Sequence, residues 1–344
     1  MKKRIMRTAA LLFSMAVLAA GCSVGGKNIR ITTGLGDSDL FKIDGSKFSV
    51  SEAKMYLTTE KNVYEESFGT DLWDKKVGDI TFEEYVKANL KDRLAQIKTL
   101  DLLAKEKKIR LSEDETNKAH TAAEKYFNAL SESEKDYMKI KLSDVESAYE
   151  NYLLAEKVYD EIVKDVNPEI SDADAKVIKV ASIYIKTFSV DENDNRVEYT
   201  DEQKEAARTK ANDILNKIKE GSDFNSLAED YTEADEIEYT FGKGEMLLEF
   251  ENVAFGLKSD EVSEVVETPD GFFIIKCIND YLEDETQKNK EEMIQDAKNK
   301  AFLDVYQPFV DSLSSEFNDK AWEKIQFMDM NGVKVANFYQ CIEE

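Results

Sequence analysis

Apolar residues recur at steps of three and four through residues 51–165, as on one face of an amphipathic helix. Within residues 82–103 the apolar positions are Phe82, Val86, Leu90, Leu94, Ile97, Leu100 and Leu103. Capping boxes, a Ser or Thr followed three residues later by Glu, mark helix starts at Thr81–Glu84, Ser112–Glu115, Ser131–Glu134 and Ser143–Glu146. The pattern predicts an all-helical unit over about 51–165, preceded by a hairpin that turns at Asp44-Gly45.

The hydrophobic period changes after Asn167-Pro168 and a short turn of helix that starts at Ser171. Residues 177–188 are rich in β-branched and aromatic side chains, which predicts a strand. Two helices follow at 201–219 and 224–231, and then come a loop, a short helix with apolar positions from Phe250 to Leu257, a Val strand over 262–266 and a closing strand over 272–278. This order predicts a compact α+β domain.

A helical pattern returns after Tyr281 and continues to about Phe317. This segment cannot bury its apolar face alone, so we expect it to pack on the first helical unit, with the α+β domain as an insertion. The predicted division is a signal peptide at 1–21, a tether at 22–28, an N-terminal helical domain at 29–176, an α+β domain at 177–281 and a returning C-terminal helix at 282–344.

The N-terminus carries a targeting signal. Four basic residues precede an apolar stretch over 9–20, which is too short to span a bilayer as a helix. The stretch ends in Leu18-Ala19-Ala20-Gly21-Cys22, which resembles the bacterial lipobox and implies lipidation of Cys22. The alternative is an ordinary secretory signal with an incidental Cys. We expect an extracytoplasmic protein, anchored to the cell membrane by the lipid on Cys22.

Charge and cysteine content exclude several functions. The net charge is −25, and removal of residues 1–21 takes away four of the 46 basic residues and none of the 71 acidic ones, which leaves −29. Such a charge disfavours nucleic acid as a partner. With one His and no CxxC pattern, we expect neither a metal site nor a cofactor. The sequence leaves open whether Cys277 and Cys341 pair.

Several motifs in 177–281 are shared with one known family. They are Gly221-Ser222-Asp223-Phe224, Phe241-Gly242-Lys243-Gly244-Glu245-Met246, Glu249-Phe250, Ala254-Phe255, Glu261-Val262-Ser263, and Thr268 with Gly271-Phe272-Phe273-Ile274-Ile275-Lys276. With these spacings the segment resembles the parvulin (PpiC, rotamase) family of peptidyl-prolyl cis-trans isomerases. The whole layout is similar to the PrsA-type foldase lipoproteins, in which a parvulin domain is inserted in a mostly helical, SurA/PrsA-like chaperone domain.

The resemblance implies a proline-binding site of known composition. Parvulins hold the proline ring with Met and Phe, beside a network of two His, a Cys or Asp, and a Thr or Ser. Met246 and Phe250 match the ring positions, and Thr268 matches the hydroxyl position. The second His position is Phe273, and one apolar pocket position is Glu238.

Two positions of the network depend on the register of the match. The first His position is Ser182, or Ile183 after a one-residue slip, and the Cys or Asp position is Ala234 or Asp235. The resulting candidate catalytic residues are Thr268, Ser182 and Asp235. The candidate substrate-binding residues are Met246, Phe250 and Phe273. An alternative is that Met246 and Phe250 only fill the core.

The resemblance implies a membrane-anchored foldase that assists the folding of secreted proteins, with isomerase activity reduced by the missing histidines. Its partners would be unfolded or partly folded secreted chains. The alternatives are a peptide-binding chaperone without catalysis, or a lipoprotein that binds an envelope partner or a solute. In the helical domain, Tyr126, Phe127, Tyr149 and Tyr152 would contact clients, or would pack between helices.

Overall fold

The computed structural model describes residues 35–325 and 337–343. The signal sequence, Cys22 and the tether lie outside the described residues, as do residues 326–336 of the predicted C-terminal segment. The chain divides into two compact units. Unit 1 combines Met1–Asp165 with Asn299–Glu344, and unit 2 is Val166–Lys298.

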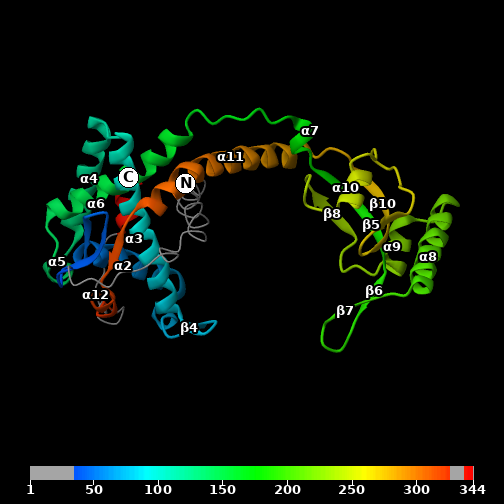
Figure 1. Cartoon of the computed structure of the whole chain (residues 1–344), viewed down its shortest axis with the longest axis horizontal. Helices are drawn as coiled ribbons and strands as arrows, with labels where there is room; N and C mark the ends of the chain where they lie inside the picture. Colours follow the sequence, from blue (N-terminus) through cyan, green and yellow to red (C-terminus); the bar gives the residue numbers. More distant parts are fainter. Residues whose placement is uncertain (1–34, 326–336, 344) are drawn as a thin grey trace. The chain divides into compact units, whose positions relative to one another are not determined.

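Unit 1 is mostly helical (Figure 1). Its helices are α2 (Val50–Phe68), α3 (Phe82–Lys107), α4 (Glu113–Ala129), α5 (Glu132–Met138), α6 (Leu142–Val163), α12 (Asp319–Glu323) and α13 (Phe338–Glu343), with a 3-10 turn at Thr70–Leu72. Its strands are β1 (Asp39–Ile43), β2 (Ser46–Ser49), β3 (Lys76–Val77), β4 (Ile80–Thr81) and β11 (Ser315–Phe317).

The capping boxes place most helix starts correctly. Thr81, Ser112 and Ser131 each cap a helix and receive the predicted Glu side chain in return. The expected box at Ser143 is wrong. Helix α6 begins earlier, at Leu142, and the Asp144 carboxylate accepts the Lys141 backbone N–H at 2.8 Å. Asp144, three residues after Lys141, therefore takes the capping role that was expected of Glu146.

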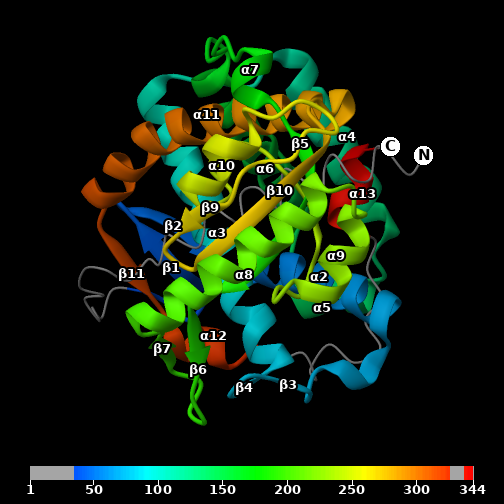
Figure 2. The ribbon, with the colours of Figure 1, turned by 90° about the vertical axis from the view of Figure 1, so that its right-hand side faces the viewer.

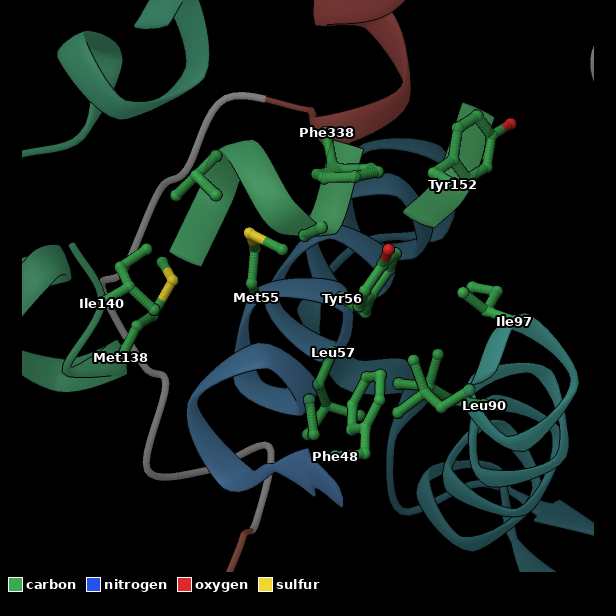
Figure 3. Close-up of a cluster of buried hydrophobic side chains, with 14 of the residues drawn as sticks. Phe48, Met55, Tyr56, Leu57, Leu90, Ile97, Met138, Ile140, Tyr152 and Phe338 are labelled. Atoms are coloured by element: carbon green, nitrogen blue, oxygen red, sulfur yellow. The ribbon is translucent and has the colours of Figure 1, made fainter. Parts of the chain in front are cut away.

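The core of unit 1 is built from both ends of the chain (Figure 3). Phe338 of α13 is fully buried, and its ring stacks on Tyr149 at a centroid distance of 4.0 Å. Of the two alternatives for these aromatic residues, the structure supports packing between helices for Tyr126, Tyr149 and Tyr152, which are buried, while Phe127 is half-buried.

A small sheet joins the two ends of unit 1. Strands β1 and β2 form the predicted hairpin, with Asp44 and Gly45 at positive φ in its turn. Strand β11 pairs antiparallel with β1, so that Phe41 lies opposite Phe317. The predicted helix up to Phe317 is therefore wrong at its end, because residues 315–317 form a strand that completes this sheet.

Helix α11 (Glu283–Ser312) belongs to both units. In unit 2, Thr286 Oγ1 accepts the Val177 N–H at 3.0 Å. In unit 1, the Tyr159 hydroxyl donates to Asn299 Oδ1 at 2.8 Å. The helix is thus fixed by side-chain hydrogen bonds on each side of the boundary.

Unit 2 contains a four-stranded antiparallel sheet in the order β8-β5-β10-β9. The strands are β8 (Glu238–Phe241), β5 (Ile178–Lys186), β10 (Gly271–Asn279) and β9 (Val266–Thr268). Strands β6 (Phe188–Val190) and β7 (Arg196–Glu198) form a separate hairpin. The helices are α7 (Asp172–Ala175), α8 (Asp201–Lys219), α9 (Phe224–Tyr231) and α10 (Leu248–Ala254).

The structure corrects three strand predictions in unit 2. The first strand ends at Lys186, since the chain leaves the sheet at Thr187 and enters the β6–β7 hairpin. The Val strand starts at Val266, because Val262 makes only an isolated bridge to Lys276. Part of the predicted loop is strand β8, which pairs with β5.

Side chains of β5 and β10 alternate between two separate cores, one on each face of the sheet. Helices α8 and α9 belong to one face and α10 to the other (Figures 1 and 2). Ala181, Ile183 and Ile185 pack with Phe272 and Ile274 under α8 and α9. On the opposite face, Ile178, Val180 and Ile275 pack with Phe241, Phe250 and Ala254 of β8 and α10. A mixed helix-and-sheet domain inside a helical chain confirms the predicted α+β class.

Gly271 begins β10 at a very close backbone approach. Its φ is +149°, and a Cβ built there would lie 2.2 Å from the carbonyl oxygen of Ile185. Only glycine permits this contact between β10 and β5, which brings the β9–β10 turn onto the end of β5.

Both remaining cysteines are buried, and no disulfide links Cys277 to Cys341. Across residues 35–325 and 337–343, no helix is long and apolar enough to cross a membrane.

Candidate functional site

A hollow of about 140 Å³ opens on the α10 face of the sheet. It is lined almost wholly by apolar atoms, from Tyr239, Met246, Leu247, Phe250 and Phe273. These residues come from β8, the turn before α10, α10 itself and β10. The structure therefore brings together Met246, Phe250 and Phe273, which the sequence singled out for substrate binding.

Aromatic packing fixes the floor of the hollow. Phe273 lies opposite Tyr184 in the β5–β10 register, and the two rings stack at a centroid distance of 4.4 Å. The edge of Phe250 meets the Phe273 ring at 5.1 Å and 77°. Such stacked and edge-on pairs are the favoured aromatic arrangements and hold both rings in place.

Two leucines at the hollow face solvent. Leu247, which lines the hollow, is 38% exposed, and its neighbour Leu248 is 67% exposed. Exposed apolar side chains beside an apolar hollow are typical of a binding surface. Met246 is half-buried, so it also remains reachable from outside.

Ser182 is fully buried in β5, opposite Ile275. Its backbone N–H donates to the Ile237 carbonyl, but within the described residues its hydroxyl has no hydrogen-bond partner. By strand alternation Ser182 faces the same side as Val180 and Tyr184, whereas Ile183 packs in the other core. Ser182 does not line the hollow.

The Thr268 hydroxyl belongs to the β9–β10 turn. Its Oγ1 donates to the Gly271 carbonyl at 3.0 Å and accepts the backbone N–H groups of Asp270 and Gly271, both at 3.3 Å. The side chain is buried. Its hydrogen is therefore already committed to the turn.

Asp235 is exposed in the loop between α9 and β8. Residues just before it attach this loop to β5. Thr232 Oγ1 accepts the Tyr184 N–H at 3.1 Å, and the Glu233 carboxylate accepts the Lys186 N–H at 2.8 Å. Asp235 and Ala234 stay outside the hollow, and Ser182, Thr268 and Asp235 form no shared hydrogen-bond network among the described residues.

Sequence reasoning missed three residues of the site. Tyr239 and Leu247 line the hollow, and Tyr184 supports Phe273. The Tyr184 hydroxyl donates to the Asp270 carbonyl at 2.7 Å, and burial, with the nearby Asp270 charge, raises the pKa of Tyr184 to about 12. Strand alternation from Ser182 could have indicated Tyr184.

The apolar position that the motif match gives to Glu238 is occupied by its neighbour. Glu238 is exposed and pairs with Lys179 at 2.7 Å, while Tyr239 lines the hollow. The hollow can thus receive an apolar ring against mostly apolar side chains. No group of three potential ligands within the described residues could hold a metal ion.

Comparison with known proteins identifies the domain. Residues 188–279 match the model of the PPIC-type PPIASE domain, a rotamase family. The match includes the hollow but begins after Ser182 and Tyr184 of β5.

The chain as a whole is similar to foldases. Foldase protein PrsA of Caldanaerobacter subterraneus is 27% identical over 78% of this chain and 83% of its own length. PrsA of Staphylococcus aureus is 27% identical over 72% and 81%. A solved structure of PrsA from Bacillus cereus is 18% identical, covers 92% of this chain and 99% of its own, and gives a TM-score of 0.35. The rotamase match and the two PrsA relatives together show a PrsA-like chain, with a parvulin-type rotamase domain between helical segments.

Proposed function

We propose that this protein is an extracytoplasmic foldase that seats prolines of unfolded secreted chains in the hollow of unit 2. The observation that carries the proposal is the apolar hollow formed by Met246, Phe250 and Phe273. Foldase activity is what the names of the PrsA relatives state for those proteins.

An apolar hollow suits this chemistry. Rotation about a peptide bond meets a barrier of about 18–20 kcal/mol, because the amide must lose its planarity. The reaction breaks no covalent bond and needs no cofactor. An enzyme accelerates it by binding the twisted amide better than the planar one. A fixed ring pocket supplies part of this effect by holding the proline while the preceding residue turns.

We further propose that the activity is reduced. The positions where parvulins carry histidines hold Ser182 and Phe273, and the Thr268 hydroxyl is committed to its own turn. Few polar groups therefore remain to stabilise the twisted amide. These features also favour a second candidate function, in which the hollow binds extended peptide without catalysis.

The mature chain, residues 22–344, provides the test. Exchange NMR with a proline tetrapeptide measures the cis-trans rate, and suppression of aggregation of an unfolded protein measures chaperone activity. We expect Met246→Ala and Leu247→Ala to weaken peptide binding several-fold. Tyr281→Ala is the control, since Tyr281 is an exposed aromatic residue that does not line the hollow.

Each outcome selects one function. Binding with a measurable rate supports the isomerase, and binding without a rate supports the peptide-binding chaperone. If the wild-type chain binds and both variants bind equally well, the hollow is not the site. If neither activity occurs, the foldase proposal fails in favour of binding to an envelope partner or solute.

We also propose lipid attachment at Cys22 and the domain division at 29–176, 177–281 and 282–344. The Leu18-Ala19-Ala20-Gly21-Cys22 motif supports the first, and the change of hydrophobic period supports the second. Labelling with a radioactive fatty acid in a bacterial host tests the anchor. If the Cys22→Ala variant is labelled as strongly as the wild-type chain, lipidation at this residue is ruled out.

A further inference from the structure

The segment that builds the hollow is strongly acidic. Residues 235–251 supply four of the five lining residues, and they carry six carboxylates and one lysine. That lysine, Lys243, lies 3.9 Å from the Asp174 carboxylate. The wall of the hollow therefore belongs to a segment with a net charge of −5.

Two acidic residues of the segment, Asp235 and Glu236, lie near Tyr239, which lines the hollow. The hydroxyl of Tyr239 donates to the Glu236 backbone carbonyl at 2.7 Å. Burial raises the pKa of the Tyr239 phenol, and the negative charges of Glu236 and Asp235 raise it further. Both carboxylates are thus within electrostatic reach of a residue that lines the hollow, and both belong to exposed residues.

Three other carboxylates of the segment are engaged, and a fourth, Glu249, is exposed in the first turn of α10. Glu238 pairs with Lys179 at 2.7 Å, and Glu245 and Glu251 accept the backbone N–H groups of Gly242 and Gly244. Asp235 and Glu236 are exposed and, among the described residues, make no side-chain hydrogen bond or ion pair, so they are open to an incoming group. They lie in a loop that is anchored to β5 by Thr232 and Glu233 and to Tyr239, a residue of the hollow, by the Glu236 carbonyl.

We propose that the hollow selects prolines that are flanked by lysine or arginine, through attraction to Asp235 and Glu236. This inference rests on the proposed function of the hollow. Opposite charges at the rim of a binding site favour the matching partner and reject the like-charged one. Since both carboxylates are exposed, each pair is weak and is screened by salt.

The experiment compares two sets of three tetrapeptides. The first set is Ala-Lys-Pro-Phe, Ala-Leu-Pro-Phe and Ala-Glu-Pro-Phe. The second set carries Lys, Leu or Glu directly after the proline instead of before it. Dissociation constants and exchange rates are measured with the mature chain. We expect the Lys peptide to bind about threefold to tenfold more tightly than the Glu peptide in at least one of the two sets. The preference should shrink to about twofold or less in 0.5 M salt.

The decisive variant is Asp235→Asn with Glu236→Gln, which should remove most of the preference for the Lys peptide over the Glu peptide. The matched control is Asp213→Asn with Glu229→Gln, which makes the same charge change on α8 and α9, over the opposite face of the sheet. This control should keep the full preference.

The failures are distinguishable. Equal binding of the Lys and Glu peptides overturns the charge selection, while binding of the Leu peptide still supports the proposed function. A preference that survives the double variant overturns the assignment to Asp235 and Glu236. If no peptide binds, the proposed function itself fails, and this inference fails with it.

Discussion

Glu52 is an ionisable side chain held inside unit 1. Its backbone N–H is capped by Ser49, but the Oε1 atom is buried and has no hydrogen-bond partner among the described residues. Burial raises the pKa of Glu52 to about 7; the Lys98 charge opposes this rise, and Asp101 and Asp144 add to it. The folded protein therefore binds a proton at Glu52 more tightly than the unfolded chain does.

The sign of the pH effect follows from this difference. Between about pH 4.5 and 7 the unfolded chain loses the Glu52 proton first, so the stability that the neutral carboxyl provides falls as the pH rises. Glu52→Gln keeps the group neutral. We expect the variant to match the wild type near pH 4.5, and to be more stable by about 1–3 kcal/mol at pH 8.

Urea unfolding at both pH values checks this prediction. Glu124→Gln, an exposed change on α4, should show no such pH-dependent gain. An equal stability difference between Glu52→Gln and the wild type at pH 4.5 and pH 8 would contradict the assignment.

At the same residue scale, part of the candidate site was predictable. Met246, Phe250 and Phe273 do meet in one hollow, because motif spacing fixes which residues face it. The hydrogen bonds of Thr268 were not predictable, since they depend on how the turn backbone bends. Tyr239 was missed because the motif match aligned the neighbouring Glu238 with the apolar position.

At the scale of elements, helix α6 allows a comparison between two neighbouring residues. Asp144 accepts the Lys141 N–H at the first turn, whereas Ser143 is exposed and does not cap the helix. We expect Asp144→Ala to lower the free energy of unfolding by about 1 kcal/mol, through the lost hydrogen bond and the lost charge at the helix N-terminus.

Ser143→Ala serves as the comparison and should change stability by less than about 0.5 kcal/mol. Denaturant unfolding followed by the helical circular dichroism signal measures both. A larger loss for Ser143→Ala than for Asp144→Ala would mean that the helix starts where the capping-box pattern put it.

Helices were easier to predict than strands for a physical reason. A capping box and an apolar stripe lie within the helix they specify, as at Thr81 and Ser112. Strands β8 and β11 are three or four residues long and exist because β5 and β1 offer them an edge. Because their partner strands are remote in sequence, no local sequence pattern predicts β8 and β11.

At the scale of the whole molecule, unit 1 depends on its C-terminal segment. Phe338 is fully buried, stacks on Tyr149 and contacts Tyr56 at a centroid distance of 4.9 Å. We expect Phe338→Ala to destabilise unit 1 by about 3–5 kcal/mol, because it leaves a cavity at the centre of an aromatic cluster.

Hydrogen exchange, read separately for each unit, is the suitable measurement because two units need not unfold together. Amides of α4 and α6 should exchange faster in Phe338→Ala. Amides of β5 and β10 should keep their wild-type protection. Faster exchange in the strands as well would show that the two units unfold as one.

The pairing of β1 with β11 also has a consequence for biosynthesis. A ribosome makes residues 39–43 long before residues 315–317, and α13 later still. Unit 1 therefore cannot complete its core until most of the chain has been synthesised. Unit 2 is one continuous stretch of chain and can fold earlier. During its synthesis, the chain would pass through a stage in which unit 2 is complete while part of the apolar core of unit 1 is still exposed.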